Sequence, residues 1–237
     1  SASERGWLIW KLADELESRA ERLIQLETID NGKPVFESKI DLFQAIGVLR
    51  YFAGWCDKIH GTTLPSTGPQ FIYTRREPVG VVAAIVPWNF PILMATWKVA
   101  PALACGNTVI LKPATETPLT ALELADAAEK AGIPPGALNV IPGRGSIVGR
   151  ALVEHPGVDK IAFTGSTEVG KDIAKRGAET LKRISLELGG KSANVIMSDA
   201  NIDQAIRGAL VGIFYGKGEV CAAGSRLIVS SKVHDQV

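Results

Sequence analysis

Apolar positions in the first fifty residues repeat at the three-to-four spacing of an amphipathic helix. The repeating positions are Trp7, Leu8, Ile9, Leu12, Leu16, Ala20, Leu23 and Ile24. The segment Asn31-Gly32-Lys33-Pro34 ends this helix, because glycine suits the residue after a helix and proline cannot continue one. A second amphipathic helix is predicted over residues 35–55.

Residues 60–80 break the helical pattern. The segment is rich in glycine, threonine and proline, and residues 71–75 read as an exposed strand. We therefore predict a protruding strand or hairpin at this position.

From residue 79 onward, short apolar runs alternate with helical segments. The runs cover residues 81–86, 108–111, 138–141, 160–163 and 185–188, and the helices cover about 91–104, 119–131, 145–154 and 166–178. Such alternation predicts an α/β fold with a doubly wound, Rossmann-like parallel sheet. Ligands of these sheets bind at the carboxyl ends of the strands, so functional residues are expected there.

Composition narrows the class of protein. The 237 residues are 46% hydrophobic and 22% charged, as in ordinary globular proteins. A net charge of +1 argues against nucleic acid or an anionic membrane surface as a partner. The longest apolar run, residues 79–87, is too short to cross a membrane.

Three scattered cysteines argue against a disulfide framework and favour a reducing, cytoplasmic location. The chain starts at Ser1 without an initiator methionine or a signal-peptide pattern, and it stops soon after a strand-like segment at 227–230. We expect segments to be missing at both ends. We predict no metal site.

Two strand ends carry polar candidates. The first run is followed by Pro87-Trp88-Asn89-Phe90-Pro91. Asn89 either caps the following helix or presents its amide to an oxygen atom of a substrate. Lys112 follows the second run, where a lysine either lies in solvent or binds a ribose or phosphate.

Two glycine-rich segments resemble nucleotide-binding motifs without matching them. Residues 143–149 miss the dinucleotide fingerprint because the last glycine comes one place late. Residues 165–172 miss the phosphate-loop pattern because Asp172 stands where a metal-binding hydroxyl belongs, which argues against a nucleoside triphosphatase. The Gly165-Ser166 turn before a helix still suits a pyrophosphate.

Glu187 and Cys221 are the remaining candidates. A carboxylate in the apolar run before Gly189-Gly190 is expected either to form an ion pair or to act as a base. Cysteines are usually buried and inert, as expected for Cys56 and Cys105. The small residues around Cys221 would instead let a substrate approach its thiol.

Taken together, these segments resemble the aldehyde dehydrogenase superfamily. The matching motifs are Val-Pro-Trp-Asn-Phe-Pro (86–91), Leu-Lys-Pro-Ala (111–114), Phe-Thr-Gly-Ser-Thr-Glu-Val-Gly (163–170), Glu-Leu-Gly-Gly-Lys-Ser (187–192) and Cys-Ala-Ala-Gly-Ser-Arg (221–226). The resemblance covers nearly the whole chain, including the Asp30–Pro34 turn, and five motifs in order are far more specific than any one of them.

The resemblance implies a role for each catalytic candidate. Cys221 matches the nucleophile that attacks an aldehyde to form a thiohemiacetal and then a thioester. Asn89 matches the residue that stabilises the oxyanion together with the Cys221 backbone N–H. Glu187 matches the general base that activates water. The implied substrate is a small aldehyde, the implied cofactor is NAD or NADP, and the full-length protein is expected to be a homodimer or homotetramer.

The resemblance also implies the cofactor contacts. Lys112 matches the adenosine-ribose contact, and Pro87, Trp88 and Leu188 match the nicotinamide side. The full expected set is Val86, Pro87, Trp88, Lys112, Thr115, Gly145, Phe163, Gly165, Ser166, Val169 and Leu188.

Three departures from the family pattern affect these expectations. Thr115 stands where many NAD-preferring members have a glutamate that binds the ribose, so NADP is a possible cofactor. Glu219 precedes the thiol by two residues and is expected to point to solvent. Family chains are roughly twice as long; we expect residues 1–189 to form the cofactor-binding domain and residues 190–237 to begin the catalytic domain.

Two alternatives stay open. An acylating member of the family would pass the thioester to coenzyme A, although Glu187 argues against this because such members commonly lack that base. A non-catalytic dinucleotide-binding fragment is the second alternative.

Overall fold

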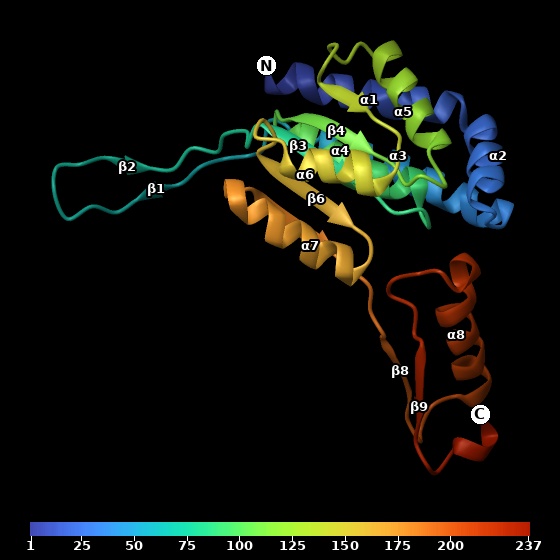
Figure 1. Ribbon diagram of the computed structural model, residues 1–237. Coiled ribbons are helices and arrows are strands. Elements are labelled where there is room, and N and C mark those ends of the chain that lie inside the picture. Colours follow the sequence, from blue (N-terminus) through green and yellow to red (C-terminus); the bar gives the residue numbers. More distant parts are fainter.

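Five short apolar segments pair as parallel strands at the centre of the protein. The computed structural model describes residues 1–237, and its main sheet has the order β5-β4-β3-β6-β7 (Figure 1). The strands are β3 (Val81–Ile85), β4 (Thr108–Lys112), β5 (Leu138–Val140), β6 (Lys160–Thr164) and β7 (Arg183–Glu187). All neighbouring pairs are parallel, which confirms the predicted α/β, doubly wound fold.

Helices cover both faces of this sheet because successive strand residues point to opposite sides. Ala84 and Leu111 pack with α4 (Pro91–Ala104) and α5 (Leu119–Lys130). Ala83 and Phe163 pack on the other face with α6 (Arg150–Glu154) and α7 (Thr167–Gly177). The helix predicted over 145–154 is a π-helical turn, Gly145–Gly149, followed by α6.

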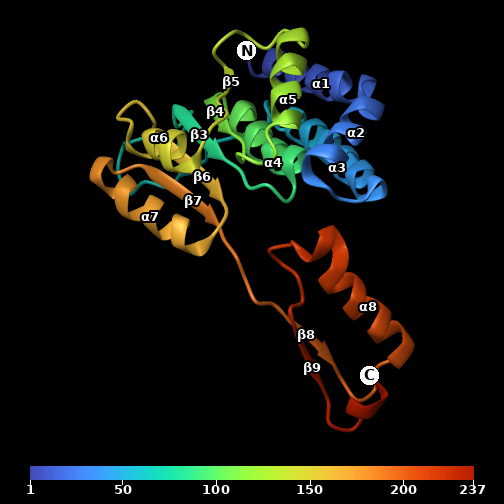
Figure 2. The same ribbon diagram turned by 45° about the vertical axis from the view of Figure 1, so that its right-hand side comes forward.

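Three N-terminal helices lie outside α4 and α5 (Figure 2). They are α1 (Ala2–Ser18), α2 (Ala20–Asn31) and α3 (Val35–Ala53). The single helix expected up to Asn31 is wrong, because Arg19 has a non-helical backbone with φ −112° and ψ 21°. The Arg19 guanidinium donates to Asp126 of α5 at 2.6 Å, which ties the break to the neighbouring helix.

The segment expected to protrude is a hairpin of β1 (Thr63–Leu64) and β2 (Ile72–Tyr73), which pair antiparallel. It extends away from the main sheet (Figure 1). Its apolar side chains are exposed, with Phe71 77% accessible. The predicted hairpin is confirmed.

The last fifty residues form a second small unit beside the main body (Figures 1 and 2). It contains β8 (Ala193–Ile196), α8 (Ile202–Phe214) and β9 (Arg226–Val229), and the two strands pair parallel. Asn201 caps α8 by accepting from the Gln204 N–H at 3.1 Å. Three short 3-10 turns complete the chain, at Ala178–Thr180, Tyr215–Gly218 and His234–Gln236.

The two helix-associated cysteines differ in burial. Cys56 is buried, as expected. Cys105 is exposed, so the expectation of burial is wrong: it is the C-cap of α4 and precedes Gly106, whose φ of 80° is left-handed. None of the helices has the length and apolar character that a membrane crossing needs.

A buried ionic cluster joins α2 to α3. The Lys33 ammonium lies 2.6 Å from the Asp41 carboxylate and 3.2 Å from that of Glu27, and all three side chains are 1% accessible. Burial raises the pKa of Glu27 and of Asp41, and the Lys33 charge opposes this. Removing the cation would leave two unpaired carboxylates in the interior, which is costly.

Lys33→Met is therefore expected to lower the free energy of unfolding by about 3–5 kcal/mol at pH 7, measured by urea titration. The difference in stability between wild type and Lys33→Met should shrink toward pH 4. In the variant, Lys33 no longer opposes the effect of burial on the pKa values of Glu27 and Asp41, so both carboxyl groups take up protons more readily in its folded state as the pH falls. The exposed Lys58→Met serves as control and should change stability far less. Equal stability of wild type and Lys33→Met would show that the cluster does not stabilise the fold.

Candidate active site

The turn after β3 presents an asparagine to the C-terminal unit. Val86 is buried and its N–H donates to the Lys112 carbonyl at 3.1 Å, which extends the strand pairing by one residue. The N-cap of α4 is Phe90 and makes no side-chain cap bond, so Asn89 does not cap this helix. The Asn89 amide instead donates to the Glu219 carbonyl at 2.7 Å. Residues 130 apart in sequence are thereby joined.

The Glu219 carbonyl lies two residues before Cys221, so this bond brings the amide to the thiol loop. Cys221 is exposed and lies in a turn after the 3-10 segment Tyr215–Gly218. The Gly189-Gly190 turn approaches the same loop, since a Cβ atom on Gly190 would lie 3.3 Å from the Cys221 carbonyl oxygen. A larger residue at this position would press against the loop.

Glu187 ends β7 and pairs in register with Thr164 of β6. Its side chain is exposed although it stands in an apolar run of the sequence, and it forms no ion pair. The reason is that β7 alternates: Arg183, Ser185 and Glu187 share an exposed face, whereas Ile184 and Leu186 pack toward α7. The carboxylate is accessible at the same sheet edge as Asn89.

A lysine that no sequence motif indicated lies near this carboxylate. Lys98 sits within α4 and is partly buried. Burial lowers its pKa to about 8, the negative charge of Glu187 opposes this, and the positive charge of Lys160 adds to it. A lone lysine among apolar helix residues gives no sequence signal, because only the fold places it against β7.

The turn after β6 leads directly into α7. Ser166 is the N-cap, and its hydroxyl accepts from the Val169 N–H at 3.3 Å. A Cβ atom on Gly165 would lie 2.4 Å from the Phe163 ring, so only glycine fits the turn over that ring. Val169 is half exposed on the first turn of the helix. This leaves a short, open helix N-terminus of the kind that binds phosphate.

The remaining predicted contacts lie along the same edge with differing exposure. Lys112 is buried, and its ammonium donates to the Pro113 carbonyl at 2.6 Å. Burial lowers the pKa of Lys112, an effect that the nearby Glu116 carboxylate opposes. The exposed Thr115 hydroxyl donates to the Gly143 carbonyl at 3.3 Å, which joins the ends of β4 and β5. Gly145 is exposed at the start of the π-helical turn.

The motifs did not predict the surroundings of two further residues at this edge, Leu188 and Glu219. Leu188 is half-buried against α7, where a Cβ atom on Gly170 would lie 2.5 Å from its Cδ2 atom. Glu219 does not point to solvent alone, because its carboxylate lies 2.9 Å from the Lys217 ammonium. Its charge is therefore balanced within the loop.

The arrangement fits a dinucleotide. Strand order reverses between β3 and β6, and the crevice at such a switch point is where open α/β sheets bind nucleotides. Trp88 and Gly165 flank this point. The buried Thr164 hydroxyl beside it has no hydrogen-bond partner within the chain.

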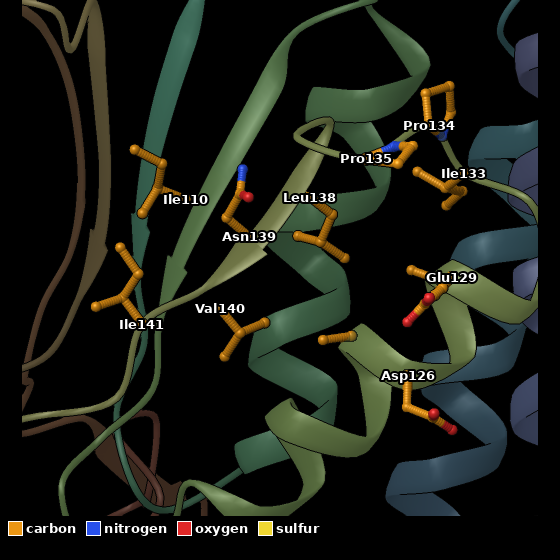
Figure 3. A pocket seen from close by; sticks show the side chains of 12 residues that line it. Ile110, Asp126, Glu129, Ile133, Pro134, Pro135, Leu138, Asn139, Val140 and Ile141 are labelled. Carbon is orange, nitrogen blue, oxygen red and sulfur yellow. The ribbon is translucent and has the colours of Figure 1, made fainter.

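A hollow of about 780 Å³ lies elsewhere, between α5 and the edge strand β5 (Figure 3). Ile133, Pro135, Leu138 and Val140 form much of its wall. None of the predicted site residues lines it. The candidate residues indicated by the motifs therefore lie outside this hollow.

Comparison with known proteins identifies the family of this chain. The model of the aldehyde dehydrogenase family matches residues 1–237. Retinal dehydrogenase 2 of Taeniopygia guttata is 52% identical over 237 residues, 99% of this chain and 46% of that protein. The mitochondrial aldehyde dehydrogenase of Rattus norvegicus is also 52% identical, over 99% of this chain and 46% of its own length. The NAD⁺ complex of an aldehyde dehydrogenase from Bacillus cereus superposes with a TM-score of 0.98 at 48% identity, covering 100% of this chain and 48% of that one.

The chain belongs to the aldehyde dehydrogenase family. It spans about half the length of the relatives it matches.

The position of Lys98 gives a testable electrostatic consequence. Its ammonium should titrate with a midpoint near pH 8 in this chain, against about 10.4 for an unperturbed lysine. The midpoint can be followed by the ¹³Cε chemical shift, with Lys98→Arg to assign the signal. Glu187→Gln should lower the midpoint further, because the carboxylate favours the charged amine. A midpoint that Glu187→Gln leaves unmoved would show that the two groups do not interact.

Proposed function

We propose that the full-length protein oxidises an aldehyde to a carboxylic acid with NAD⁺ or NADP⁺, through a thioester on Cys221. The observation that carries this proposal is the 2.7 Å hydrogen bond from the Asn89 amide to the Glu219 carbonyl. It holds an oxyanion donor beside the thiol loop at the end of a nucleotide-binding sheet. The retinal and mitochondrial aldehyde dehydrogenases named above support the reaction class.

Carbon–sulfur bond formation comes first, because an aldehyde has no carbinol to oxidise until a nucleophile adds to it. The Cys221 thiolate attacks the carbonyl carbon and the carbonyl electron pair moves to oxygen. One N–H of the Asn89 amide is held by Glu219, which orients the second N–H for the new oxyanion. The Cys221 backbone N–H is the second donor.

A nicotinamide held at this edge would supply the hydride acceptor for the thiohemiacetal carbon, and its reduction would leave a thioester on Cys221. Glu187 takes a proton from water as the water attacks this thioester, and the thiolate departs. The exposed carboxylate at the end of β7 is open to water, which suits this step.

The cofactor is assigned to the switch point between β3 and β6. Gly165, Ser166 and the first turn of α7 would hold its pyrophosphate, with Val169 and Phe163 beside it. Val86, Pro87, Trp88 and Leu188 line the nicotinamide side, and Lys112, Thr115 and Gly145 line the adenosine side. The Bacillus cereus relative was solved with NAD⁺, which supports this class of cofactor.

The proposal extends to the domain boundary, the contact between subunits and the cellular location. Residues 1–189 form the cofactor-binding domain and residues 190–237 begin the catalytic domain, since the chain leaves the main sheet after β7. The exposed apolar hairpin β1–β2 suits contact between subunits of a homodimer or homotetramer. Free cysteines suit a cytoplasmic location.

Absorbance of reduced cofactor tests the reaction directly in the full-length protein with propanal or benzaldehyde. Cys221→Ala should bind cofactor and produce no reduced cofactor. Glu187→Gln should give one burst per active site and then turn over about 10²- to 10⁴-fold more slowly, because deacylation lacks its base. Steady turnover of Glu187→Gln at the wild-type rate would place the base elsewhere. Release of acyl-coenzyme A by the wild type, when water and coenzyme A compete, would favour the acylating alternative.

Thr115 is expected to influence the choice between the two cofactors. Thr115→Glu places a carboxylate near the adenosine ribose, where it can accept from hydroxyls and repel a 2′-phosphate. The ratio of kcat/KM for NAD⁺ to that for NADP⁺ should rise about tenfold or more. Thr115→Gln, which is similar in length and uncharged, is the control. An unchanged ratio in Thr115→Glu would show that this position does not set the preference.

A further inference from the structure

The turn at the end of α2 contacts both the turn that carries Asn89 and the loop that carries Cys221. We propose that Asn31 and Lys33 form a clamp that positions the Asn89 amide against the Cys221 loop. Neither residue touches a reacting atom, so both act as positioning residues. The proposal rests on the proposed function, since it explains how the thiol and the amide keep their mutual geometry.

The first contact fixes the peptide that precedes Asn89. The Asn31 side-chain amide donates to the Trp88 carbonyl at 2.7 Å. The Thr117 hydroxyl donates more weakly to the same oxygen, at 3.4 Å. The Trp88 carbonyl therefore cannot rotate without breaking the Asn31 bond, and Asn89 follows directly.

The second contact fixes the residue on the other side of Asn89. The Lys33 ammonium lies 4.9 Å from the centre of the Phe90 ring, a cation–π distance. The Glu27 carboxylate binds Lys33 through Oε1, and its Oε2 atom accepts from the Ile92 N–H at 3.4 Å. Asn89 thus sits between two residues that are both held by the end of α2.

The third contact reaches the thiol loop. The Lys217 ammonium donates to the Asn31 carbonyl at 2.6 Å. The Gly216 N–H donates to the buried Glu37 carboxylate of α3 at 3.1 Å. Asn31 therefore bridges the two parts, with its side chain on the Asn89 turn and its carbonyl on the Cys221 loop.

The loop needs such support because its backbone is strained. Gly216, Lys217 and Gly218 have φ values of 57°, 60° and 77°. A left-handed φ is easy for glycine and unfavourable for lysine. The bond to Asn31 and the ion pair with Glu219 at 2.9 Å hold Lys217 in this conformation.

The clamp accounts for these contacts better than a purely stabilising role. Hydrogen bonds of half-exposed groups add little to the free energy of folding. A small displacement of a catalytic group can nevertheless slow a reaction about 100-fold. The effect of breaking the Asn31 bonds should therefore appear in the acylation rate and not in thermal stability.

Asn31→Asp is the primary test in the full-length protein. The substitution keeps the shape of the side chain and replaces the N–H donor by an oxygen that repels the Trp88 carbonyl. The burst rate with an aldehyde should fall about 10- to 100-fold, measured by stopped-flow absorbance of reduced cofactor. Alkylation of Cys221 by iodoacetamide needs no oxyanion donor, so its rate should change less than about twofold.

A second variant and a matched control accompany it. Lys217→Met removes the hydrogen bond to the Asn31 carbonyl. It should slow the burst by a similar factor and leave the alkylation rate nearly unchanged. This variant tests the clamp if Asn31→Asp does not fold. Lys217→Arg should restore most of the burst rate. Asn201→Asp is the control, because its carboxylate still caps α8 far from the turn and should leave both rates unchanged.

Combination with Asn89→Ala shows whether the clamp acts through Asn89. In that background Asn31→Asp should slow the burst by less than about twofold, because the donor it positions is already gone. An undiminished effect there, or unchanged burst rates in both Asn31→Asp and Lys217→Met, would overturn the clamp. If Cys221→Ala is inactive as well, the proposed function survives that result. Normal turnover of Cys221→Ala would overturn the proposed function and the clamp with it.

Discussion

Parallel pairing of β3, β6 and β7 is the constraint on which the rest of the structure depends. Parallel neighbours end at one edge of the sheet, so the segments after Ile85, Thr164 and Glu187 come together without any further device. The reversal of strand order beside β3 opens the crevice at that edge. Only the thiol has to be brought from elsewhere.

The thiol arrives by a different route, and its placement depends on a few long-range polar contacts. The loop that carries Cys221 belongs to the C-terminal unit, whose own helix, α8, has no buried residue. The Asn89 amide, the Asn31 carbonyl and the Glu37 carboxylate each bind this loop. The parallel sheet thus supplies one edge of the candidate site, and three polar contacts from the main body hold the Cys221 loop against it.

Much of the fold could be predicted from apolar periodicity. The five runs and four following helices recur close to their expected positions because each buries one face against the sheet. The break at Arg19 could not be predicted, because neither glycine nor proline stands there and the contact of Arg19 with Asp126 comes from another helix. The elements β8 and α8 were not among the predicted elements, and apolar side chains of α8, such as Val211 and Phe214, are exposed in this chain.

Residue types at the strand ends indicated most of the candidate site, but not its environment. Asn89, Gly165 and Cys221 stand where motif order predicts, whereas the exposure of Glu187 and the closeness of Lys98 follow from which face of β7 is covered. The contacts of Asn31 could not be predicted for a similar reason. The sequence around Asn31 predicts only the end of a helix, and the fold alone brings Trp88 and Lys217 within hydrogen-bond distance of it.

A crystal structure of the full-length protein with an aldehyde bound covalently to Cys221 would show directly whether Asn89 binds the oxyanion. We expect the adduct oxygen to lie about 2.7–3.1 Å from the Asn89 amide nitrogen, with the bonds from Asn89 to Glu219 and from Asn31 to Trp88 intact. An adduct oxygen directed away from Asn89, or an aldehyde bound covalently to another residue, would contradict this expectation.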